Sequence, residues 1–194
     1  MVFDALFFLN SVLFGVGLAM DAFSVSVANA MAEPKMKNGR ICLIAGTFAV
    51  FQIAMPLFGW LCVHTIVEKF TAFERFIPWI ALVLLCWIGG GMLRDGIRGE
   101  GSEEGAALSF GALALQGVAT SIDALSVGFT IADYPLPAAL AEAAIIGTVT
   151  FAICFAGLLL GRRLGERLSR RAPVVGGLIL IGIGLEIFIK GLTG

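Results

Sequence analysis

The sequence predicts an all-α polytopic membrane protein with six transmembrane helices arranged as two inverted three-helix repeats. Its 194 residues are 59% hydrophobic and 14% charged, with a mean hydropathy of +0.98. Soluble domains are about 45–50% apolar and about 25% charged, so the composition excludes an ordinary soluble domain. At about 20 apolar residues per span, the chain has room for six helices. The 13 Lys and Arg balance 14 Asp and Glu, which excludes a basic nucleic-acid-binding surface.

Polar breaks separate six apolar runs, and each run is expected to be a helix because open strands would leave backbone groups unpaired in lipid. The first run is too long for a cleaved signal peptide. We place the spans near residues 5–32, 41–66, 77–97, 107–132, 137–161 and 174–193. The first repeat then covers residues 1–98, a charged linker covers 99–106 and the second repeat covers 107–194, all within one membrane domain.

The distribution of Lys and Arg predicts the orientation of these spans. Ten of the 13 lie in the first, third and fifth connections or at the adjoining helix ends. Cytoplasmic loops carry the excess of positive charge in membrane proteins. These three connections, the 99–106 linker among them, are therefore expected in the cytoplasm, with both termini on the opposite side.

An internal repeat relates the two halves of the chain. A shift of 102 residues places Asp21 on Asp123, with identical neighbours at several positions on either side. Weaker matches follow in the second and fifth spans and in the third and sixth. Because three spans is an odd number, the second half must enter the membrane from the opposite face. Inverted repeats of this kind are typical of secondary transporters, which bind substrate near the midplane.

Two aspartates are expected near the middle of the membrane. Asp21 and Asp123 each lie well inside a span, where a carboxylate costs at least about 2.5–3.5 kcal/mol. Each should therefore face a partner or a water-filled cavity, and the repeat should bring both to one site. A protonated, hydrogen-bonded pair that serves only packing is the alternative.

The polar residues near these aspartates offer oxygen ligands. Gln52 brings an amide into the second span, one turn before Pro56. The supporting polar residues are Ser24, Asn29, Thr120, Ser121 and Ser126. Carboxylate, hydroxyl and amide oxygens suit Mg²⁺, Ca²⁺ and Mn²⁺, whereas the four cysteines are scattered singly and predict neither disulfides nor a thiolate metal site.

Two further acids lie in the second half. Glu186 is deep in the sixth span, where it either carries protons or pairs with Lys190 four residues later. Glu142 is interpreted as a structural residue near the outer interface. The 25 glycines are expected to support close helix packing, in clusters rather than in a clean pattern of small residues four apart.

Four stretches resemble the signatures of the bacterial MntP-type manganese efflux pumps, and the resemblance covers essentially the whole chain. They are Gly17-Leu-Ala-Met-Asp-Ala-Phe-Ser-Val-Ser26, Phe51-Gln-Ile-Ala-Met-Pro-Leu-Phe-Gly-Trp60, Ala119-Thr-Ser-Ile-Asp-Ala-Leu-Ser-Val-Gly128 and Gly176-Gly-Leu-Ile-Leu-Ile-Gly-Ile-Gly184. The resemblance implies a multi-pass exporter of the bacterial inner membrane that lowers cytoplasmic Mn²⁺, with Mn²⁺ as transported substrate and no cofactor. The family's intramembrane aspartates fall on Asp21 and Asp123, and Gln52 falls where the family carries a carboxylate or an amide.

The sequence therefore predicts a transporter, not an enzyme, which exports Mn²⁺ by alternating access with Asp21, Asp123 and Gln52 as ligands. Protons are a candidate counter-ion, and the oligomeric state is left open. The alternatives are an exporter of amino acids or other small cations from the same broad superfamily, a passive channel, and an intramembrane aspartyl protease. The protease is disfavoured because its Tyr-Asp and Gly-x-Gly-Asp contexts are absent around both aspartates.

Overall fold

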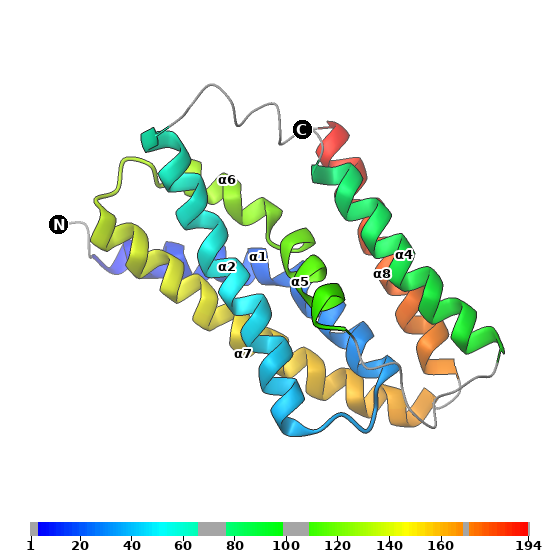
Figure 1. The fold of residues 1–194 in the computed structure, drawn as a ribbon. Coiled ribbons are helices and arrows are strands. Elements are labelled where there is room, and N and C mark those ends of the chain that lie inside the picture. Colours follow the sequence, from blue (N-terminus) through cyan, green and yellow to red (C-terminus); the bar gives the residue numbers. More distant parts are fainter. Residues whose placement is uncertain (1–3, 66–76, 99–108, 169–170, 194) are drawn as a thin grey trace.

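The structure, a computed structural model, describes residues 4–65, 77–98, 109–168 and 171–193. Within these ranges it contains helices and no strands, which confirms the all-α class. The predicted linker at 99–106 lies outside them. The helices are α1 (Ala5–Ala32), α2 (Asn38–Thr65), α4 (Ile77–Arg98), α5 (Phe110–Ala119), α6 (Ile122–Thr130), α7 (Leu136–Leu168) and α8 (Ala172–Thr193) (Figure 1).

Three of these helices are long and apolar enough to cross a membrane. They are α1, α2 and α7, and a fourth span results if α5 and α6 are counted as one broken span. The helices α4 and α8 occupy the ranges predicted for the third and sixth spans. Within the described ranges the structure thus supports three or four spans, and the count of six stays a prediction.

The fourth predicted span, 107–132, is not one continuous helix. It breaks between α5 and α6, with a bend of 43°. Thr120 Oγ1 donates to the carbonyl of Gln116 at 2.9 Å, and Ser121 Oγ donates to the carbonyl of Gly117 at 2.7 Å. Hydroxyl side chains that bond to the preceding turn compete with the helical backbone and bend helices. The break therefore follows from a Thr-Ser pair and not from proline.

The helices α1 and α7 pack closely in the same direction. A Cβ at Gly157 would lie 2.8 Å from the Phe23 ring, and one at Gly165 would lie 2.9 Å from the Met31 carbonyl oxygen. Gly161 meets the Val27 carbonyl in between. Gly157, Gly161 and Gly165 are spaced four apart, so the chain does contain the clean small-residue pattern that we did not expect. Such residues let membrane helices approach closely.

The other helix pairs have defined directions as well. Gly59 of α2 faces Gly128 of α6, and Phe51 of α2 faces Gly117 of α5. The helix α2 therefore runs parallel to the α5–α6 pair. The helices α4 and α8 lie side by side (Figure 1). Gly89 contacts Gly177 and Trp79 stacks edge-on against Phe188 at 4.6 Å. These two contacts show that α4 and α8 are antiparallel.

Polar contacts identify the two ends of the bundle. At one end Arg40 forms a 2.9 Å salt bridge with Glu33, and Arg162 donates to Asn38 at 3.2 Å. At the other end Trp60 Nε1 donates to the Tyr134 carbonyl at 2.9 Å. The end of α1, the start of α2 and the end of α7 therefore lie together. The α7 helix continues to Leu168, seven residues beyond the predicted span, because charged side chains at a helix end can reach the aqueous interface.

Candidate functional site

The Gln52 side chain connects the two halves of the chain. It is 1% exposed, and its Nε2 donates to the carbonyl oxygen of Leu18 at 3.1 Å and to that of Thr120 at 3.0 Å. Two carbonyl acceptors also fix which end of the amide carries the nitrogen. The Thr120 carbonyl is exposed to this donor because the α5–α6 helix breaks there. One side chain of α2 thus holds α1 and the break together.

The two carbonyls occupy equivalent places in the repeat. Leu18 and Thr120 are related by the same shift of 102 residues that relates Asp21 to Asp123, and each carbonyl lies three residues before its aspartate. With both of its N–H groups donated, the Gln52 amide leaves Oε1 as a buried oxygen with no hydrogen-bond partner among the described residues. Buried polar atoms are nearly always hydrogen-bonded. This oxygen is therefore suited to coordinate a cation.

Each aspartate follows one of the two bonded carbonyls by three residues, about one helical turn. Asp21 is half-buried on α1, and Asp123 is exposed in the first turn of α6, where its Oδ1 accepts the Ala124 N–H at 3.0 Å. The first turn of a helix favours a negative charge because its N–H groups are unpaired within the helix. Two carboxylates and one neutral amide oxygen are the donor types that a hard divalent cation accepts.

The predicted supporting hydroxyls are mostly bonded to their own helices. Ser24 donates to the Met20 carbonyl, and Thr120 and Ser121 donate to the preceding turn of α5. Ser126 is exposed, and Thr130 donates to its carbonyl. Thr120 and Ser121 therefore shape the backbone beside the aspartates, a role that residue type and spacing alone do not reveal.

Asn29 is not at the Gln52 junction. Its Nδ2 donates to Gln116 Oε1 at 2.8 Å, and Gln116 Nε2 donates back to Asn29 Oδ1 at 3.2 Å. Both side chains are buried, at 4% and 1% exposure. The sequence places polar residues at both positions, but that they bond to each other across 87 residues of chain is visible only in the fold.

Of the two further acids, the structure describes the side chain of one. The side chain of Glu186 lies outside the described residues. Glu142 is 2% exposed on α7, and its Oε2 has no hydrogen-bond partner in the part of the chain that the structure describes. Across residues 4–65, 77–98, 109–168 and 171–193, no three His, Cys, Asp or Glu side chains cluster as a metal site. The four cysteines are free thiols in the structure.

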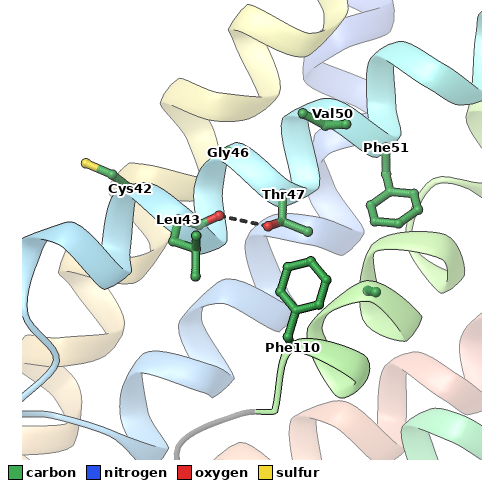
Figure 2. A pocket seen from close by; sticks show the side chains of 8 residues that line it. Cys42, Leu43, Gly46, Thr47, Val50, Phe51 and Phe110 are labelled. Atoms are coloured by element: carbon green, nitrogen blue, oxygen red, sulfur yellow. Dashed lines mark hydrogen bonds between the residues drawn. The ribbon is translucent and has the colours of Figure 1, made fainter.

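A groove of about 540 Å³ lies apart from these residues, between α2 and α5. Figure 2 shows Phe110 of α5 across an open space from Thr47 of α2. None of the candidate ligands lines the groove, whose walls are almost entirely apolar. Its lining residues are Cys42, Leu43, Gly46, Thr47, Val50, Phe51, Phe110 and Ala114.

Comparison with known proteins identifies the family. The family described as "Putative manganese efflux pump" matches residues 35–188. The chain belongs to this family. Three relatives named "Putative manganese efflux pump MntP" support the assignment, and each alignment covers 92–96% of both chains. They are 42% identical over 181 residues (Ruminiclostridium cellulolyticum), 40% over 183 (Methanosarcina mazei) and 38% over 188 (Sorangium cellulosum). No solved structure matches.

Membership of the manganese efflux pump family excludes the aspartyl protease reading, since the relatives are named as pumps and not as enzymes. It also agrees with the apolar helices of a multi-pass membrane protein. The resemblance found in the four sequence motifs is thereby confirmed.

Proposed function

We propose that this protein exports Mn²⁺ from the cytoplasm by alternating access. The family and the named relatives support the cargo and its direction. The observation that carries the mechanism is the Gln52 amide, which joins two repeat-equivalent carbonyls at 3.1 and 3.0 Å beside the two aspartates. Because this one side chain bonds to both halves, its hydrogen bonds depend on how the halves lie relative to each other.

In this proposal Asp21, Asp123 and Gln52 bind the ion. The two carboxylates neutralise its charge. Gln52 Oε1 supplies a neutral oxygen that has no hydrogen-bond partner among the described residues. Backbone carbonyls at the α5–α6 break and the hydroxyl of Ser24 or Ser126 complete the set of candidate ligands. Broken helices commonly build ion sites in transporters because unwound backbone lines the cavity.

The inverted repeat is part of the proposal, and the helix packing supports it. The first half contains α1, α2 and α4, and the second contains α5–α6, α7 and α8. The parallel pair α1–α7 corresponds to the parallel pair α6–α2 when the halves are exchanged. The antiparallel pair α4–α8 corresponds to itself. A pseudo-twofold axis in the membrane plane produces this pattern, and the two halves can then rock about the site.

The same packing supports the proposed orientation in the bacterial inner membrane. The basic ends of α2 and α7 lie together, and we place that end in the cytoplasm by the positive-inside rule. Both termini then lie outside. Proton return through the same carboxylates is proposed as the driving reaction, and a transport rate in proteoliposomes that ignores a pH gradient would exclude it.

A manganese-tolerance assay tests this function. A pump-deficient bacterium should regain tolerance with the intact chain but not with Asp21→Asn or Asp123→Asn at equal expression. The asparagine variants keep the side-chain size and remove the charge. Cellular Mn content measured by mass spectrometry should rise in both variants. Full tolerance in both would show that the site is elsewhere.

A further inference from the structure

We propose that α5 is the cytoplasmic gate of the transporter, hinged at Thr120–Ser121 and latched by the Asn29–Gln116 amide pair. This inference rests on the proposed function, because a gate has meaning only if a cargo passes. It assigns a role to two features that the ion site does not use, the amide pair and the α2–α5 groove, and a second role to the helix break.

The latch lies on the cytoplasmic side of the ion site. Asn29 is eight residues beyond Asp21 on α1, and Gln116 is seven residues before Asp123. At 1.5 Å per residue, both amides lie about 10–12 Å from the aspartates in the same direction. The pair joins α1 of the first half to α5 of the second, so it closes the path between the halves at this level.

The residues around the amide pair are buried. Asn29, Gln116 and the nearby Leu113 are 4%, 1% and 2% exposed. In this proposal the paired amides therefore represent the closed state of the cytoplasmic path.

The gate can open without separating α1 from its main packing partners. The main packing partners of α1 are α7 and α8, whereas α5 packs on α4 and α2. The two hydrogen bonds of the amide pair thus join α1 to α5 where the helices share little backbone contact. Such a joint can break and re-form as the halves move, because each amide can bond to water or to the ion once it is released.

The hinge and the space for the motion are both present. Near the break, α5 is tightly held, because a Cβ at Gly117 would collide with the Phe51 ring of α2. Toward its start, α5 is separated from α2 by the groove between Phe110 and Thr47 (Figure 2). The helix is therefore held against α2 at Gly117, and the groove provides space beside its cytoplasmic end, into which we propose that this end moves.

Thiol labelling tests the latch without depending on the cargo. Ser24→Cys is placed in a chain whose native cysteines are replaced, and inside-out membrane vesicles are treated with a membrane-impermeant maleimide. Asn29→Leu and Gln116→Leu should each speed labelling about tenfold, as expected if roughly 1.4 kcal/mol is lost from the closed state. The exchanged pair, Asn29→Gln with Gln116→Asn, should return the rate to that of the parent. Unchanged labelling in both leucine variants would overturn the proposal.

A second variant tests the groove and covers the case in which the leucine variants fail to fold. Gly46→Phe fits the structure, since a Cβ at Gly46 meets nothing within 4 Å, but its ring fills the groove and blocks the swing of α5. It should slow cytoplasmic labelling and abolish Mn²⁺ export. Gly39→Phe, on the same helix outside the groove, also meets nothing within 4 Å and should change neither. Equal export by both phenylalanine variants would contradict the gate. If the Ser24→Cys chain labels as predicted but the chain with its native Ser24 moves no Mn²⁺, only the cargo is contradicted.

Discussion

The carbonyl oxygens of Leu18 and Thr120 share one donor, Nε2 of Gln52, at 3.1 and 3.0 Å. The two residues come from opposite halves of the chain, and each precedes an intramembrane aspartate by three residues. This junction favours an amide over a carboxylate at position 52. Only an NH₂ group can donate to both carbonyls, and the remaining oxygen is then held in a fixed direction.

Replacement of Gln52 should impair both binding and export. Gln52→Leu removes the two donors and the oxygen ligand, and it leaves two backbone carbonyls without this partner. Loss of a group that orients metal ligands typically costs about 10–100-fold in metal affinity. Isothermal titration calorimetry of the purified protein with Mn²⁺ measures the loss of affinity.

Gln52→Glu is the matched control for this variant. It keeps the shape and an oxygen but cannot donate to the carbonyls when ionised. Affinity should fall in this variant as well, although it adds a charge that attracts the cation. If Gln52→Glu binds Mn²⁺ more tightly than the intact chain, then the amide donors do not organise the site.

The α1–α7 interface should be intolerant of larger side chains. Gly161→Ala places a methyl group against the Val27 carbonyl and 2.9 Å from the Ala30 Cβ. Overpacking of a filled interface typically costs about 1–3 kcal/mol. The folded fraction after heating, read by fluorescence-detected size-exclusion chromatography, should therefore fall at a lower temperature. Gly182→Ala lies on α8, where a Cβ meets nothing within 4 Å. This variant should unfold at the same temperature as the parent.

Single cysteines should report the orientation of the bundle. Lys37 and Asp133 are both exposed, one before α2 and the other between α6 and α7. In intact cells a membrane-impermeant thiol reagent should label Asp133→Cys and not Lys37→Cys, and inside-out vesicles should give the reverse. Labelling of both positions from one side would contradict the positive-inside assignment.

Much of this fold could be predicted from hydrophobic runs and charged breaks. The run from residue 5 to 32 coincides with α1 because an uninterrupted apolar segment in lipid has no alternative to the helix. The shift that superposes Asp21 on Asp123 is likewise visible in the sequence, and it predicts that the two carboxylates share one site.

The remaining features depend on competition and partners that a one-dimensional pattern does not contain. The break at Thr120–Ser121 has no proline, and it arises from hydroxyls that bond to the preceding turn. Leu18 could not be identified as part of the site because its contribution is a backbone oxygen. The Asn29–Gln116 pair required knowledge that α1 and α5 approach each other at those two positions.

Direct binding of Mn²⁺ tests the central claim that two carboxylates from opposite halves hold one ion. The purified intact chain should bind a saturating Mn²⁺ ion, detected by electron paramagnetic resonance as loss of the free-ion signal. Asp21→Asn and Asp123→Asn should each abolish this binding while eluting as folded protein. Undiminished binding by either folded variant would contradict the account.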